Sequence, residues 1–147
     1  MRPRFRRLGR RGNTAIEFAV VGLVFLGLLI GALELAFLFY AQIALDYATN
    51  EAARTMLVGT NRSAATSNTT FETIAFCPQL GTMLNCNNVT INLQVVTNYQ
   101  NIGTGTTTYN AGNTGSLMLL QVYYTTGLPS WPLNVSTIMS AAAYLNE

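Results

Sequence analysis

The sequence predicts an α+β fold: a long N-terminal helix, first membrane-spanning and then amphipathic, followed by a small C-terminal antiparallel β-sheet domain. Three observations lead to this fold class. An apolar run from Phe18 to Ala41 is interrupted by a single charge, Glu34. Helical spacing of apolar residues continues beyond that run. Later segments alternate apolar and polar residues, as half-buried strands do. With 147 residues, the chain can form one small domain and an anchor.

The charged residues are few and unevenly placed. They make up 10% of the chain, against roughly 25% in ordinary soluble domains. Arginines that precede an apolar helix indicate, by the positive-inside rule, a cytoplasmic N-terminus. We favour this explanation of the basic head over nucleic-acid binding and expect no nucleic-acid partner. The sequence has no histidine, which excludes histidine catalysis and His-ligated metal sites. Six of the basic residues precede Gly12, namely Arg2, Arg4, Arg6, Arg7, Arg10 and Arg11.

Residues 1–12 form a basic leader, and one helix is expected over residues 13–58. No Ala-x-Ala site follows the apolar run, so processing is expected ahead of it, after Gly12. As a helix, residues 18–41 measure about 36 Å and can cross a hydrocarbon core of about 30 Å. Gly27 and Gly31 form a G-x-x-x-G pair, a close-approach pattern between membrane helices, although glycines are also common in such helices.

Glu34 leaves two interpretations open. Its carboxylate either reaches water at the outer interface or meets a polar group on another subunit.

Beyond the membrane segment the helical pattern becomes amphipathic. Apolar residues keep a spacing near 3.6, polar residues occupy the opposite side, and Gly59 is a natural stop. Residues 59–70 are polar and are expected to form a linker. The apolar side of the amphipathic half is expected to cover one face of the sheet. Its residues include Ile43, Ala44, Ala48, Ala52 and Met56.

Residues 71–147 are expected to form a small outer domain with one disulfide. A short helix is predicted over residues 70–76. Cys77 and Cys86, in a domain placed outside the membrane, are interpreted as a disulfide pair. Two cysteines without histidine do not suggest a metal site, and no cofactor is expected.

Three strands are predicted in this domain. Residues 89–95 alternate at period two, and residues 117–125 form a second strand whose apolar run Leu117–Leu120 predicts burial on both faces. Residues 136–145 fit a strand or a short helix, and a strand is favoured because three strands make a more self-sufficient sheet. Residues 99–116, rich in Asn, Gly and Thr, predict a long flexible loop. Trp131 lies in a proline-flanked turn.

The junction Gly12-Asn13-Thr14-Ala15-Ile16-Glu17-Phe18 resembles the class III signal peptide of pilins and pseudopilins of the tight-adherence (Tad/Flp) pilus. Residues 40–54, with Gln42, Leu45 and the run Ala52-Ala53-Arg54, are similar to a pattern of TadE-like proteins. The C-terminal Tyr144-Leu145-Asn146-Glu147 echoes the family's ending, with Leu145 where an arginine is usual. A major pilin of this system is little more than the helix, so the extra domain indicates a TadE-like minor pilin or pseudopilin, with a pilin-like fold.

This resemblance implies cleavage by a prepilin peptidase between Gly12 and Asn13, which makes Glu17 the fifth residue of the mature chain. Glu17 and Phe18 would then serve assembly, with Glu17 pairing with the N-terminal ammonium of a neighbour. A structural alternative for Glu17 is a carboxylate that stabilises the helix N-terminus. The implied partners are other pilins or pseudopilins, the peptidase, the inner-membrane assembly platform and membrane lipid.

The implied function is to assemble, prime or anchor an adhesive surface pilus. The implied location is the bacterial inner membrane, crossed once, with a periplasmic or extracellular C-terminal domain. The alternative function is an unprocessed, membrane-anchored binding module that uses the loop at 99–116. An enzyme is not expected, because no nucleophile–base pair, metal cluster or phosphate-binding glycine loop is present in the sequence.

Overall fold

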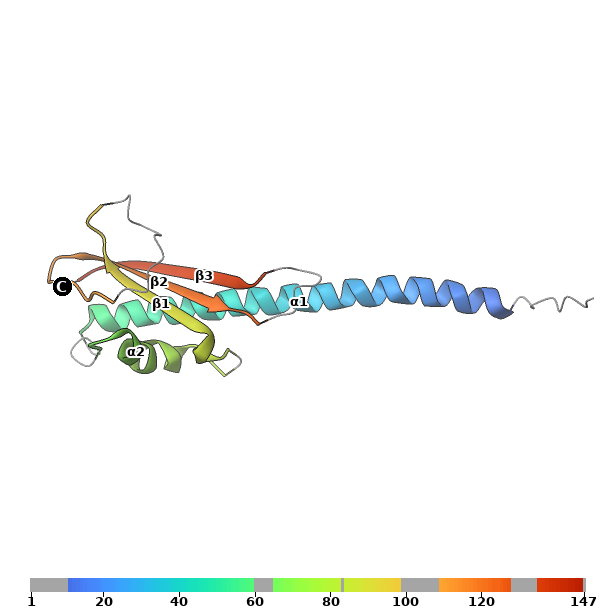
Figure 1. The fold of residues 1–147 in the computed structure, drawn as a ribbon, viewed down its shortest axis with the longest axis horizontal. Coiled ribbons are helices and arrows are strands. Elements are labelled where there is room, and N and C mark those ends of the chain that lie inside the picture. The colour runs from blue at the N-terminus through green and yellow to red at the C-terminus, as the bar shows by residue number, and fades with distance from the viewer. Residues whose placement is uncertain (1–10, 60–64, 83, 99–108, 128–134, 147) are drawn as a thin grey trace, which may run out of the picture. The chain divides into compact units, whose positions relative to one another are not determined.

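The computed structural model describes residues 11–59, 65–82, 84–98, 109–127 and 135–146 (Figure 1). The chain divides into two compact units, Met1–Phe37 and Leu38–Glu147. The first unit is helical in its described part. The second carries the end of the same helix, a short helical segment and a three-stranded sheet. The α+β fold class expected from the sequence is therefore confirmed.

Helix α1 runs from Arg11 to Leu57 and contains 47 residues. It holds no proline, and leucine and alanine, both strong helix formers, recur along it. It ends where Gly59 adopts a φ of 78°, and the Gly59 amide donates to the carbonyl of Met56 over 3.1 Å. This left-handed C-terminal residue is the stop that the sequence predicted.

The sheet has the order β1-β2-β3 and is antiparallel throughout. Its strands are β1 (Val89–Val95), β2 (Leu117–Thr125) and β3 (Thr137–Leu145). All three strands that the sequence predicted are present. The segment that also fitted a helix is β3, as favoured, because each of its residues pairs with β2 from Leu117↔Leu145 to Thr125↔Thr137.

One face of the sheet forms the core of the second unit. The pairing register places alternate residues of the strands on this face, and most are buried: Val89, Ile91, Leu93, Met118, Leu120, Val122, Tyr124, Ser140 and Tyr144. The prediction that Leu117–Leu120 is buried on both faces is wrong for Leu117 and only partly met by Leu119, which is half-buried. Leu117 points to the other face and is 39% exposed, whereas Met118 and Leu120 are fully buried. The alternation of side chains between the two faces of a strand, rather than the apolar character of the run, decides which of these residues are buried.

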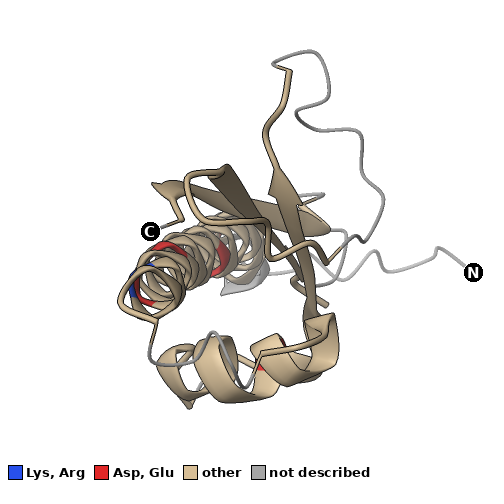
Figure 2. Cartoon of the chain, turned by 90° about the vertical axis from the view of Figure 1, so that its left-hand side faces the viewer, with Lys and Arg blue, Asp and Glu red and all other residues tan. Residues whose placement is uncertain are grey.

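Within the second unit, the last turns of α1 lie along the sheet (Figures 1 and 2). The Gln42 side chain donates to the backbone carbonyl of Met139 on β3 over 3.2 Å, which ties the helix to that strand. The alanine-rich stripe of α1 has small side chains that leave room for close packing. The fully or nearly fully buried residues of this stripe are Ala41, Leu45, Ala48, Ala52 and Met56.

A short helical segment provides the remaining core residues. It comprises α2 (Asn68–Phe71), the π-helical turn η1 (Glu72–Phe76) and the 3-10 turn η2 (Cys77–Gln79); a further turn, η3 (Cys86–Asn88), precedes β1. The Ser67 side chain caps α2 by accepting from the Thr70 amide over 3.3 Å. The helix predicted over residues 70–76 therefore begins earlier, at Asn68, inside the segment assigned as linker. Phe71, Phe76 and Leu80 are almost entirely buried.

The chain from Tyr109 onward is held against the edge of β1. The Asn110 amide donates to the Leu93 carbonyl over 2.9 Å, and the Tyr109 hydroxyl donates to the Ala65 carbonyl. The Tyr109 ring also lies 6.3 Å from that of Phe71. Of the loop predicted over residues 99–116, this part is structured, whereas residues 99–108 and the turn around Trp131 lie outside the described residues.

Candidate functional site

In the first unit, most of the apolar side chains of α1 that the structure describes are exposed. Phe18 is 80% exposed, and most valines and leucines of the segment are also exposed. The helix Thr14–Leu57 contains an 18-residue window with a mean hydropathy of 2.5 and has the length and composition to cross a membrane. An exposed apolar surface of this extent requires lipid or other apolar helices as its surroundings. The helix can therefore serve as a membrane anchor.

The expected processing junction lies at the beginning of α1. The backbone of Gly12 and Asn13 belongs to the first turn of the helix, and Glu17 follows Asn13 by four residues, one turn later. The Glu17 carboxylate is exposed near the helix N-terminus, where the macrodipole favours an anion. Phe18 is beside it in the sequence and projects outward. Residues 1–10 of the leader lie outside the described residues.

A second carboxylate, Glu34, lies on the same helix. From Glu17 to Glu34 the helix rises about 25 Å. Glu34 is only 9% exposed, and neither carboxylate oxygen has a hydrogen-bond partner among the described residues. Glu34 lies seven residues after Gly27 and three residues after Gly31, a spacing that places the three on the same side of the helix.

The charges on the second part of α1 form a solvated surface. The Arg54 guanidinium lies 3.7 Å from the Glu51 carboxylate, but its side chain is 75% exposed. Asp46 accepts a hydrogen bond from the Gln42 side chain over 3.1 Å. Figure 2 shows the charges of the described residues gathered on α1, with one further acid, Glu72, on the helical segment. An exposed pair such as Glu51–Arg54 contributes a few tenths of a kcal/mol and does not mark a site.

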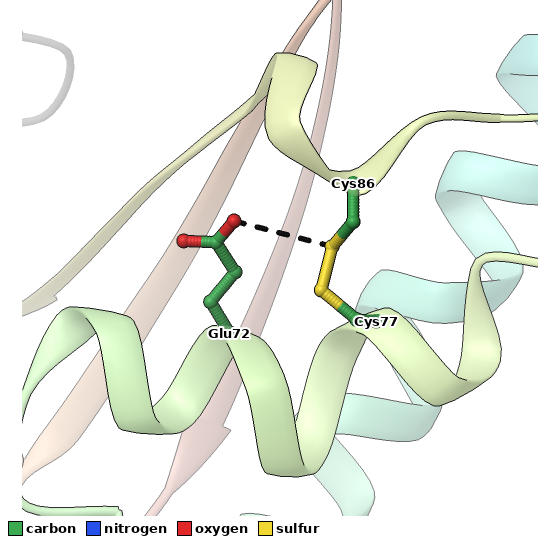
Figure 3. Close-up of side chains that lie close together, drawn as sticks. All are labelled: Glu72, Cys77 and Cys86. Carbon is green, nitrogen blue, oxygen red and sulfur yellow. Dashed lines mark hydrogen bonds between the residues drawn. A yellow bond between two sulfur atoms is a disulfide. The ribbon is translucent and has the colours of Figure 1, made fainter.

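Glu72 lies against a disulfide (Figure 3). Cys77 and Cys86 are joined, with their Cα atoms 5.8 Å apart, and Glu72 Oε1 is 3.9 Å from Cys86 Sγ. Partial burial raises the pKa of Glu72 above its ordinary value. Among the described residues these three are the one group with metal-ligand spacing. In the disulfide neither sulfur carries a proton or a thiolate charge, so the group is a covalent link in the oxidised protein.

Comparison with known proteins gives one match. Residues 12–54 match the family described as TadE-like protein. The match starts at Gly12, ends at Arg54 and lies entirely within α1, so it does not include the sheet. No curated protein and no solved structure matches the chain.

Proposed function

We propose that this chain is a minor pilin or pseudopilin of a Tad/Flp-type adhesive pilus, which it helps to assemble, prime or anchor. The observation that carries the proposal is the TadE-like match over residues 12–54, on a helix whose apolar side chains are exposed. The match begins at the residue after which the sequence indicates cleavage. The proposed location is the bacterial inner membrane, with the sheet domain on the outer side and the arginine-rich leader in the cytoplasm.

Cleavage between Gly12 and Asn13 by a prepilin peptidase would create a new N-terminal ammonium at Asn13. In assembly, that ammonium and the Glu17 carboxylate of a neighbouring subunit would meet in a low dielectric. Each charge would relieve part of the other's desolvation cost. Phe18, exposed next to Glu17, would be buried against the neighbouring helix. The other proposed partners are the assembly platform and further pilins.

The intact mass of the protein tests the proposal. The protein would be extracted from membranes of cells with and without their prepilin peptidase. We expect the chain to lose residues 1–12 only when the peptidase is present. Glu17→Gln should still be cut but should reduce the number of surface pili, whereas Glu51→Gln, on the solvated part of the helix, should not.

An uncut chain in both strains, or normal piliation of the Glu17→Gln variant, would contradict the pilin function. The alternative would then be an anchored outer domain that acts as a binding module.

A further inference from the structure

Beyond the apolar run, the outward side of α1 stays apolar for almost two further turns. Phe39, near the end of that run, is 63% exposed. Ile43 and Tyr47 follow it at i+4 and i+8 on the same side of the helix, and they are 68% and 60% exposed. We call these three residues the outward stripe. They belong to the second unit and lie on the side of α1 opposite to Leu45 and Ala52, which are fully buried.

Two polar side chains lie within these turns, but they are bonded to each other and to the sheet. The Gln42 side-chain amide donates to the Asp46 carboxylate over 3.1 Å and to the Met139 carbonyl on β3 over 3.2 Å. Gln42 and Asp46 are both half-buried. They border the outward stripe on the side towards β3, and the stripe itself carries no charged side chain.

The outward side of α1 becomes polar only after Tyr47. Asn50 and Arg54 follow Tyr47 at i+3 and i+7, and both are exposed. From Phe18 to Tyr47 the helix rises about 44 Å, and a bilayer with its headgroup regions is about 40–45 Å thick. Tyrosine is also a typical side chain of the membrane–water interface. The apolar outward surface therefore has the length of a whole bilayer rather than that of its hydrocarbon core.

We propose that the outward stripe binds interfacial lipid of the outer leaflet, so that these turns of α1 have lipid on one side and the sheet on the other. The stripe continues, along one helix, the exposed apolar side chains of the membrane segment, whose expected surroundings are lipid. Its members are bulky, whereas the surfaces on which membrane helices approach each other closely are rich in small residues. Lipid, which adapts to large side chains, therefore fits the stripe better than a partner helix does.

The inference rests on the membrane anchoring in the proposed function but not on cleavage, so its test uses the full-length chain. Trp131→Phe would remove the one tryptophan of the sequence. Each variant would then carry a single new tryptophan and be reconstituted in phosphatidylcholine–phosphatidylglycerol vesicles. Lipid brominated near the headgroup quenches tryptophan at the interface, lipid brominated deep in its acyl chains quenches tryptophan in the core, and iodide quenches tryptophan in water. The variants are Leu33→Trp, Ile43→Trp, Tyr47→Trp and Val58→Trp.

Ile43→Trp and Tyr47→Trp are expected to lose emission with lipid brominated near the headgroup and to resist iodide. Val58→Trp is the matched control, because Val58 is apolar and 67% exposed but follows Tyr47 by about 16 Å. Iodide, and not brominated lipid, should quench it, although it shares the preference of tryptophan for the interface. Circular dichroism checks the fold of each variant. If Trp131→Phe does not fold, the same variants are measured with Trp131 retained, and the quenching of the natural chain is subtracted.

Quenching of Ile43→Trp and Tyr47→Trp by iodide alone, as expected of Val58→Trp, would overturn the proposal. Protection from both kinds of quencher would also overturn it. Protection that grows with the protein-to-lipid ratio would then favour a second copy of the chain, and protection independent of that ratio would favour cover by the chain itself. Leu33→Trp distinguishes these outcomes from a failure of the proposed anchoring, because deeply brominated lipid should quench it whenever α1 spans the membrane.

Discussion

Gly112 lies where the chain returns from the edge of β1 towards β2. Its φ is 61°, and a Cβ added there would lie 2.6 Å from Met118 Sδ and 3.0 Å from Val95 Cγ2. Met118 is fully buried, so its sulfur would have to shift within the core to relieve the overlap. Gly115 has a comparable φ of 83°, but a Cβ there would meet nothing within 4 Å. A comparison of substitutions at the two glycines therefore separates the cost of backbone strain from the cost of steric overlap.

We predict that Gly115→Ala lowers the free energy of unfolding by about 1–2 kcal/mol, the cost of a left-handed backbone for a residue with a Cβ. Gly112→Ala should lower it by a further ~1–3 kcal/mol because it also overpacks the core. Urea unfolding of the detergent-solubilised protein, followed by circular dichroism, measures both. Equal losses for the two variants would show that the contact with Met118 carries no cost.

No local sequence pattern indicates this constraint at Gly112, because Met118 and Val95, the two residues that a Cβ would overlap, belong to other segments. The same limit explains Leu117: its apolar neighbours suggested burial on both faces, and only the register with β3 shows that it is on the outer face. Glu34 is a different case. Its spacing from Gly27 and Gly31 was present in the sequence, whereas its burial depends on the folded chain.

Among the elements, the helical segment before β1 is the one held by a covalent bond. The disulfide joins η2 to η3 across a separation of nine residues. The loop-entropy account attributes about 2–3 kcal/mol to closing a ring of this size in the unfolded chain. Phe71, Phe76 and Leu80 would lose part of their burial if the segment moved away from the sheet.

Replacing both cysteines by serine should therefore lower the free energy of unfolding by about 2–3 kcal/mol. Thermal unfolding of the detergent-solubilised protein measures the loss. Dithiothreitol should shift the natural protein by a similar amount and should leave the double variant unchanged, which serves as the control. A double variant that unfolds at the same temperature as the natural protein would mean that packing alone holds the segment.

The elements themselves were largely predictable because each has a local signal. The apolar run, its helical continuation and Gly59 together specify α1, and period-two alternation gives β1 its bounds. The start of α2 was missed because Ser67 acts as a cap within a run of Ser, Asn and Thr, in which several residues could serve equally well. The attachment of Tyr109 to β1 was missed because it depends on contacts with Ala65, Phe71 and Leu93, distant in sequence.

For the whole molecule, the exposed apolar helix predicts how the protein behaves when membranes are washed or dissolved in detergent. An alkaline carbonate wash should leave it in the membrane fraction, and detergent should release it, because lipid covers the side chains that are exposed in the isolated chain. Immunoblots of the two fractions measure this. Leu26→Lys combined with Leu29→Lys, each costing about 2.5–3.5 kcal/mol near a helix centre, should move the protein to the wash. A natural chain found in the wash would contradict membrane anchoring.

The candidate site was predictable only in part at this scale. The positions of Gly12, Asn13, Glu17 and Phe18 on one helix follow from the sequence, because a helix is a local structure. The chemistry expected of these four residues arises between separate chains. The disulfide was predictable from the two cysteines, whereas the position of Glu72 beside it depends on the fold.

The concentration of charge on α1 has a consequence for how the outer domain meets other molecules. Away from that helix, the described residues of the second unit include one carboxylic acid, Glu72, and no lysine or arginine. A sheet surface of this kind offers an approaching partner little long-range attraction. Encounters there should proceed at the unsteered rate of about 10⁵–10⁶ M⁻¹s⁻¹, and raising the ionic strength should scarcely change it. Contact shape, rather than electrostatic guidance, would decide which encounters persist.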